Sequence, residues 1–187
     1  METSDPESGP SSVDGDAGGS GKRAARRWWP WFRDLALVLG ILLGVRACNA
    51  PEVPAGSLPE LAGEAVDGTQ LSLAQLRGEP VMVHFWASWC GVCHMVESSV
   101  QALAGEHRVL SVASRSGAPA KVLRYMQEKQ LDFPVINDPS GQIARSFGVR
   151  AYPSILFLHP DGSLATVEVG YTTELGMRLR MWWSRLF

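Results

Sequence analysis

The stretch VMVHFWASWCGVC, residues 81–93, decides the fold of this chain. Its first six residues are almost wholly apolar, which is typical of a strand buried on both faces of a sheet. Beyond it, apolar residues recur at helical spacing and predict an amphipathic helix: Val96, Val100, Leu103 and Ala104. The two cysteines of the stretch therefore lie where a central strand passes into the N-terminal end of a helix.

Cys90 and Cys93 are placed for disulfide chemistry at this helix end. The thiolate is the reacting form of cysteine, and the partial positive charge of a helix N-terminus favours it. The intervening Gly91 and Val92 put the second sulfur about one turn further on, so the pair can close a disulfide. We expect Cys90, the outer residue, to form a mixed disulfide with a partner, and Cys93 to resolve it.

Half of a zinc site and a purely structural disulfide are the two alternative interpretations of this pair. A zinc site needs about four ligands, whereas Cys48 is the only other cysteine and the four histidines lack ligand-pair spacing. The order of strand, aromatic residue, Cys-x-x-Cys and helix favours redox chemistry over both. Neither a cofactor nor a metal ion is expected here.

Residues 85–93, FWASWCGVC, resemble the active-site segment of thioredoxin-fold proteins. They are most similar to the membrane-anchored TlpA-like thiol-disulfide oxidoreductases, in the branch linked to suppression of copper sensitivity, with the DsbE-like proteins as near relatives. The resemblance covers about residues 46–187. It implies an α/β thioredoxin fold, with a mixed central sheet flanked by helices and an N-terminal β-hairpin extension. It also implies that Trp89, Gly91 and Val92 support the reacting sulfurs.

The resemblance gives Tyr152 and Pro153 a role in substrate binding. In thioredoxin-like folds a proline immediately before this strand is cis and faces the active-site cysteines. The backbone of the residue before it hydrogen-bonds an incoming peptide. The alternative is an ordinary trans proline at the start of a strand.

His84 and Glu97 occupy positions where the family pattern is not matched. His84 lies where many thioredoxins hold a buried acid, so it either moves protons for Cys93 near neutral pH or is a core histidine. Glu97 lies four residues after Cys93, whereas many TlpA-like reductases carry a glutamate three residues after the second cysteine. The role of the family's glutamate is therefore not assigned to Glu97, which is predicted to be a surface helix residue.

Downstream of the cysteines, strand and helix patterns alternate before a final hairpin and helix, which suits a mixed sheet covered on both faces. Strands are predicted over residues 109–113, 154–158 and 164–169, and helices from Ala118 and around residues 143–147. A closing amphipathic helix is marked by apolar residues, whose tryptophan pair is expected to pack in the core or at an interface: Leu175, Leu179, Trp182, Trp183 and Leu186.

The sequence upstream of the stretch divides into segments of distinct composition. Residues 1–21 carry five acids and no Lys or Arg, and are predicted to be disordered. Residues 22–47 form a basic flank and a transmembrane signal-anchor, and 48–59 a proline-rich linker. The thioredoxin-like domain then covers 60–187, and Asp67-Gly68 marks the turn of its N-terminal hairpin.

The apolar run at residues 35–45 is eleven residues long, whereas a membrane span needs about twenty. Three tryptophans precede it, and we expect residues 28–47 to contact the lipid bilayer as an uncleaved anchor. Signal-peptide cleavage and lipidation of Cys48 are the alternatives. The basic residues at 22–27 place the N-terminus inside, so the predicted location is the inner (cytoplasmic) membrane, single-pass, with the C-terminal domain in the periplasm.

Taken together, the sequence predicts an exported, membrane-tethered thiol-disulfide oxidoreductase that acts on protein thiols and disulfides. A reductase of this kind needs a membrane electron donor. A copper-handling module is the alternative function, because two soft thiolates suit Cu(I). A peroxidase is a weaker hypothesis. The net charge of −2 gives no reason to expect nucleic acid as a partner.

Overall fold

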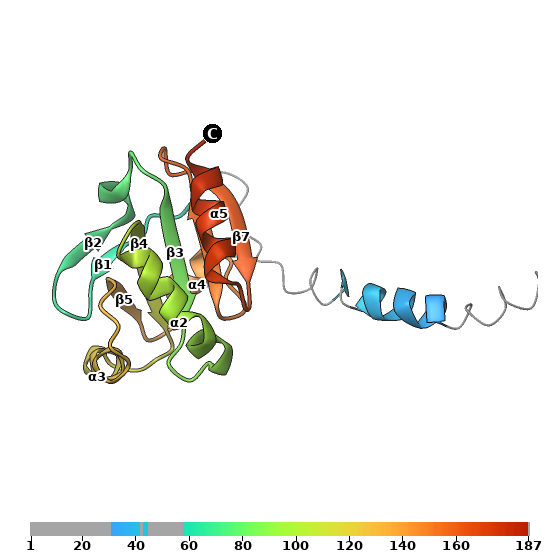
Figure 1. Ribbon diagram of the computed structural model, residues 1–187. Coiled ribbons are helices and arrows are strands. Elements are labelled where there is room, and N and C mark those ends of the chain that lie inside the picture. The colour runs from blue at the N-terminus through green and yellow to red at the C-terminus, as the bar shows by residue number, and fades with distance from the viewer. Residues whose placement is uncertain (1–30, 42, 45–57, 187) are drawn as a thin grey trace, which may run out of the picture. The chain divides into compact units, whose positions relative to one another are not determined.

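The computed structural model describes residues 31–41, 43–44 and 58–186 of the chain. The chain divides into two compact units, Met1–Val45 and Arg46–Phe187. In the first unit, residues 31–41 and 43–44 are helical (Figure 1). No helix among the described residues combines the length and the apolar character of a membrane span. The predictions for residues 1–30, for Cys48 and for the linker up to residue 57 lie outside the described part.

The second unit is built on a five-stranded mixed sheet in the order β5-β4-β3-β6-β7. Its central strand β3, whose six residues are all buried, pairs in parallel with β4 and antiparallel with β6. This confirms the predicted thioredoxin-like α/β arrangement, with β3, β6 and β7 beginning and ending where the sequence pattern places them. The strands are β3 (Val81–Trp86), β4 (Arg108–Ser114), β5 (Val135–Asp138), β6 (Ser154–Leu158) and β7 (Leu164–Val169).

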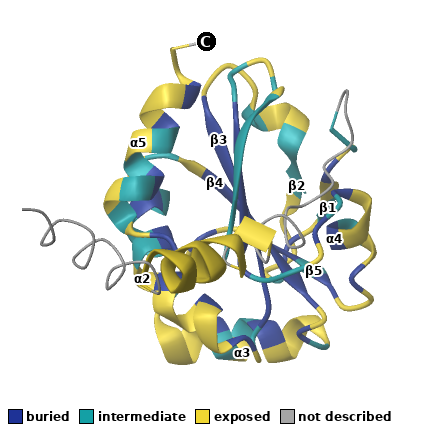
Figure 2. Cartoon of the chain, turned by 90° about the vertical axis from the view of Figure 1, so that its right-hand side faces the viewer, coloured by how far each residue is buried: buried dark blue, intermediate teal, exposed yellow. Residues whose placement is uncertain are grey.

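Alternate residues of β3 pack into two separate apolar clusters, one on each face of the sheet. Met82 and Trp86 face helices α2 (Gly91–Ala104), α3 (Pro119–Lys129) and α5 (Glu174–Ser184). Val83 and Phe85 face α4 (Gln142–Ser146) and the N-terminal elements. Figure 2 shows the strands as a buried layer between helices whose outer sides are exposed.

The N-terminal elements are two short strands, β1 (Ala62–Glu64) and β2 (Gln70–Ser72), which pair antiparallel. The carboxylate of Asp67 closes the turn between them by accepting hydrogen bonds from the backbone N–H and the hydroxyl of Thr69. A single 3₁₀ turn, η1 (Leu73–Leu76), then leads to β3.

Strand β5 is an element that the sequence pattern did not indicate. Only four residues long, it lies between Pro134 and Pro139, which read as breakers in the sequence. It forms because β4 offers a free edge, on which Ser111 to Ser114 pair with Val135 to Asp138. Pairing with a neighbour that is distant in sequence therefore decides this strand, and local propensity does not.

The closing helix α5 packs against α2 and β6 with a side different from the one expected. Met177, Met181 and Ser184 are buried, whereas Trp182 and Trp183 are 58% and 52% exposed. The tryptophan pair was expected in the core or at an interface; the core alternative is therefore wrong, and the interface alternative stays a prediction. The helix is apolar on two opposite sides, so periodicity alone cannot choose between them, and the flexible methionines fill the space above α2.

Candidate active site

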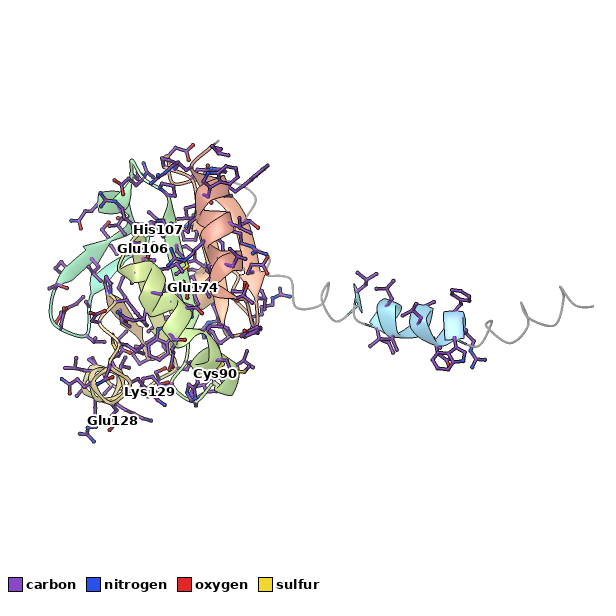
Figure 3. All side chains as sticks on the ribbon, viewed as in Figure 1. Cys90, Glu106, His107, Glu128, Lys129 and Glu174 are labelled. Carbon is purple, nitrogen blue, oxygen red and sulfur yellow. A yellow bond between two sulfur atoms is a disulfide. The ribbon has the colours of Figure 1, made fainter. Side chains whose placement is uncertain are left out.

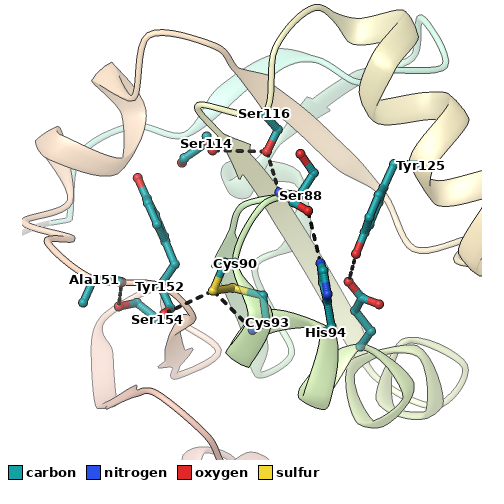
Figure 4. The surroundings of a disulfide bond; sticks show 11 residues. Ser88, Cys90, Cys93, His94, Ser114, Ser116, Tyr125, Ala151, Tyr152 and Ser154 are labelled. Carbon is teal, nitrogen blue, oxygen red and sulfur yellow. Dashed lines mark hydrogen bonds between the residues drawn. A yellow bond between two sulfur atoms is a disulfide. The ribbon is translucent and has the colours of Figure 1, made fainter.

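Cys90 and Cys93 form a disulfide at the N-terminal end of α2, with their Cα atoms 5.2 Å apart (Figure 4). Cys90 is the N-cap residue of the helix, and its Sγ accepts the backbone N–H of Cys93 at 3.2 Å. Cys90 is 8% exposed and Cys93 fully buried, so Cys90 carries the outer sulfur and Cys93 the inner one. A sulfur held at this point faces the positive end of the helix, which favours a thiolate after reduction.

The loop before β6 brings Tyr152 and Pro153 to this disulfide. The peptide bond between them is cis, as the resemblance implies. The Sγ of Cys90 lies 3.5 Å from the carbonyl oxygen of Tyr152, across 62 positions of sequence. The loop is held by backbone contacts, including one from Gly170 N–H to the Pro153 carbonyl at 2.8 Å. The backbone of Tyr152, a residue of intermediate exposure, therefore lies directly beside the outer sulfur.

Trp89 and the residue before it are fixed by the loop that follows β4. The indole Nε1–H of Trp89 donates to the carbonyl of Arg115 at 3.0 Å, and the Ser88 N–H donates to the Ser116 hydroxyl at 2.9 Å. The Trp89 ring stands edge-on to Tyr152, with ring centroids 6.0 Å apart, and is 62% exposed. Ser116 was missed in the sequence, because nothing local marks a serine 26 residues from Cys90.

His94, on α2, contacts the segment between β3 and Cys90 from the side of the helix. Its ring Nε2 lies 3.1 Å from the carbonyl oxygen of Ser88, within hydrogen-bond distance (Figure 4). The His94 ring is exposed, and its centroid lies 5.8 Å from that of the Tyr125 ring. Ser88 is thus anchored through its N–H to Ser116 and through its carbonyl to His94, which fixes the chain that leads into Cys90.

Glu97 is buried, and its prediction as a surface residue is wrong. Only 7% of the residue is exposed, and its carboxyl group accepts a hydrogen bond from the Tyr125 hydroxyl. Burial raises the pKa of Tyr125, and the hydrogen bond to Glu97 raises it further, so the hydroxyl stays protonated and remains the donor. A carboxyl group can be buried when it has such a partner, and a helix pattern alone does not reveal the partner.

Replacing Glu97 tests the strength of this buried pair. We expect Glu97→Ala to lower the free energy of unfolding by about 1–3 kcal/mol, because the Tyr125 hydroxyl is left without its acceptor. The matched change Ser98→Ala at the next, exposed position should stay within about 0.5 kcal/mol. Urea unfolding of Glu97→Ala, Ser98→Ala, Tyr125→Phe and the double variant Glu97→Ala/Tyr125→Phe provides the measurement. Additive effects of the two substitutions would contradict a direct interaction.

His84 lies in the core under the cysteine helix. It is fully buried, and burial lowers its pKa to about 3, so the ring is neutral at physiological pH. Its Nδ1 lies 3.5 Å from the Ser111 hydroxyl, which also donates to the His84 carbonyl at 3.2 Å. Nε2 has no hydrogen-bond partner. This environment favours the core interpretation over proton transfer near neutral pH.

No group of three or more His, Cys, Asp or Glu side chains within the described part of the chain is arranged to hold a metal ion. The residues gathered around the disulfide are instead sulfur, backbone carbonyls and aromatic rings. This set suits the exchange of electrons between sulfur atoms.

Comparison with known proteins gives concordant matches. The model of the AhpC/TSA family matches residues 54–167. A thioredoxin-like protein of Haemophilus influenzae is 30% identical over 158 residues, which are 83% of this chain and 92% of that protein. The thiol-disulfide oxidoreductase ResA of Oceanobacillus iheyensis is 30% identical over 114 residues, 59% of each. The exposed lipoprotein thioredoxin of Streptococcus pneumoniae, a crystal structure, matches with a TM-score of 0.57 at 29% identity, covering 66% of this chain and 98% of that one.

Proposed function

This chain belongs to the AhpC/TSA family and is a thioredoxin-like thiol-disulfide oxidoreductase, and we propose that it reduces or exchanges disulfides of exported proteins through Cys90 and Cys93 while tethered to the inner membrane. One observation carries the assignment of the reacting pair. The outer sulfur caps α2 and lies 3.5 Å from the Tyr152 carbonyl, while the inner sulfur is shielded beneath it.

The reduced pair would transfer two electrons in two sulfur exchanges. The Cys90 thiolate attacks one sulfur of a substrate disulfide, the substrate S–S bond breaks, and the other substrate sulfur leaves as a thiolate. The Cys93 thiolate then attacks Sγ of Cys90, releasing the second substrate sulfur and closing the Cys90–Cys93 disulfide. The oxidised pair in this structure is the end point of that cycle. An electron donor in the membrane must reduce it again.

Tyr152 and Pro153 would place the substrate for this attack. The Tyr152 carbonyl lies beside Cys90, and an extended peptide could pair with this edge of backbone as it would with a strand. Trp89, standing edge-on to Tyr152 and exposed, would supply apolar contact to the same peptide. Gly91 and Val92 occupy the first turn of α2 between the two sulfurs, where they fix the spacing of the pair.

The membrane tether rests on the first 47 residues. Basic residues at 22–27, tryptophans at 28, 29 and 31, and the apolar run 35–45 fit an anchor over residues 28–47 with the N-terminus inside. The domain from residue 60 would then lie in the periplasm, where disulfides persist. Cleavage of the anchor or lipidation of Cys48 would export the same domain.

Expression of the full chain in a Gram-negative host tests this function. We expect the protein to stay in the membrane fraction after carbonate extraction and its periplasmic Cys90–Cys93 pair to be mainly reduced on thiol trapping, as a reductase requires. The purified chain should reduce a model protein disulfide with a chemical dithiol as donor. A pair found mainly oxidised in cells would contradict the reductase direction. Tight Cu(I) binding without disulfide exchange would favour copper handling, and rapid peroxide consumption would favour a peroxidase.

A further inference from the structure

The outer face of α5 is an apolar stripe exposed to solvent. Its five large side chains are each between 50% and 67% exposed: Leu175, Leu179, Trp182, Trp183 and Leu186. The first four lie on α5 and, at 3.6 residues per turn, fall within an arc of about 100°, opposite the buried Met177, Met181 and Ser184; Leu186 lies in the turn that follows the helix. Figure 2 shows α5 at the margin of the domain with its outward side exposed. A contiguous patch of this kind marks an interaction surface.

Arginines that are themselves held in place border the stripe. Arg178, on one side, forms ion pairs with Glu106 and Glu174. Arg180, on the other side, forms one with Glu168. The borders are therefore polar and carry paired charges, while the face between them is apolar. Leucine and tryptophan on one face, with arginine along its edges, is the composition of a helix that lies in the headgroup region of a bilayer.

The C-terminal end of the stripe lies at the same end of the domain as Leu58, where the described part of the domain begins. Leu58, the first described residue of the domain, lines a cleft together with the β6–β7 turn at Asp161 to Ser163. The C-terminal end of α5 reaches this end too, because the Ser184 carbonyl lies 3.0 Å from the ring Nδ1 of His159. Cys90 lies at the other end of β3: in Figure 3 it is at the bottom, and Figure 1 marks the C-terminus at the top.

The length of the connecting segment permits contact with a membrane. Residues 48–57, which lie between the anchor and Leu58, number ten and span at most roughly 35 Å when extended. A domain tethered by such a segment stays within one domain diameter of the bilayer, and its apolar stripe meets lipid at a high effective concentration. The bilayer is therefore the partner that this surface encounters first and most often.

We propose that the outer face of α5 docks on the headgroup region of the membrane that tethers the domain. The inference rests on the tether put forward under Proposed function. Leu175, Leu179 and Leu186 enter the edge of the acyl region, and the two tryptophans lie at the headgroups. With α5 flat on the surface, Cys90 is held at a fixed height beside the bilayer, within reach of a donor embedded in the membrane.

Site-directed spin labelling of the full chain in lipid nanodiscs tests this docking. Cys48→Ser is introduced, the Cys90–Cys93 disulfide is kept, and one nitroxide is attached through Leu179→Cys. The matched control carries it through Lys129→Cys, an exposed position on α3 (Figure 3). We expect the label at 179 to gain accessibility to oxygen and lose most of its accessibility to an aqueous nickel chelate, while the label at 129 stays aqueous.

A charged variant shows whether the apolar stripe causes the docking. With the label moved to Leu175→Cys, the changes Leu179→Glu and Trp182→Glu should return it to aqueous accessibility without altering disulfide reduction in solution. If the chain stays in the nanodisc but the label at 179 is as accessible to the nickel chelate as the label at 129, the docking is overturned while the tether stands. If the label at 179 is shielded from both oxygen and the nickel chelate, and its spectrum shows dipolar broadening, the stripe contacts a second copy of the chain and the docking on lipid is overturned. Release of the chain from the nanodisc contradicts the tether, and the docking with it.

Discussion

Replacing Cys90 with alanine should abolish the reduction of protein disulfides. The outer sulfur is the one at the helix end and beside the Tyr152 carbonyl, and the fully buried Cys93 cannot take its place. We expect kcat/KM with a protein disulfide to fall by at least about 10³-fold, as happens when a covalent nucleophile is removed. A coupled turnover assay with a chemical dithiol as donor provides the measurement. Cys48→Ser is the matched control and should leave the rate unchanged.

Replacing Cys93 should give a different defect, although it stops turnover equally well. Without the inner sulfur, the mixed disulfide on Cys90 is not resolved, so partner proteins should accumulate covalently bound and appear as higher bands on non-reducing gels. Isolating these adducts from cells that express Cys93→Ala identifies the substrates and the donor. Adducts on Cys93 in the Cys90→Ala variant, in similar yield, would contradict the assignment of Cys90 as the attacking sulfur and Cys93 as the resolving one.

The elements predicted correctly from the sequence are those whose local residue pattern agrees with the environment that tertiary packing gives them. β3 is apolar on both faces because it is the central strand, and the helix after it begins at the cysteines because Cys90 caps it. The cis bond before Pro153 followed from a motif that joins this proline to the cysteines. These features lie in or beside the middle of the sheet, where the residues that local sequence favours are also those that packing against the neighbouring elements requires.

The residues that were predicted wrongly or missed are those whose environment is set by distant partners. Glu97 is buried because Tyr125, on another helix, supplies a hydroxyl to its carboxyl group. The core-facing side of α5 is Met177 and Met181, which no periodicity distinguishes from the leucine and tryptophan side. Ser116 holds the active-site loop from the far end of β4. Each depends on a contact between elements that the order of residues does not display.

His84 should make the stability of the protein depend strongly on pH between 5 and 7. Its pKa is about 3 in the folded state and about 6.5 when unfolded, because burial penalises the charged ring. The unfolded chain therefore binds an extra proton below pH 6.5, and the folded state loses stability as the pH falls through this window. Between pH 7 and pH 5 the loss is about 2 kcal/mol. The lowered pKa values of four exposed carboxyl groups act mainly below about pH 5, where the unfolded chain begins to take up protons on them: Asp67, Glu79, Glu106 and Asp161.

The variant His84→Leu should remove this pH dependence at little cost in stability. Nε2 has no partner to lose, and the Ser111 hydroxyl keeps the backbone carbonyl of residue 84 as its acceptor. Urea unfolding of both proteins at pH 5, 6 and 7 measures the difference, and a wild-type slope that survives in His84→Leu would assign it to other groups.

The same variant tests proton transfer. At pH 7 a group with a pKa of about 3 is protonated in about one molecule in 10⁴. It therefore has almost no proton to give during the resolution of a mixed disulfide. The rate of that step should show the same pH profile in His84→Leu as in the wild type. A shifted profile would mean that His84 exchanges protons with Cys93 in spite of its burial, and the pKa in the mixed-disulfide state would then have to lie well above 3.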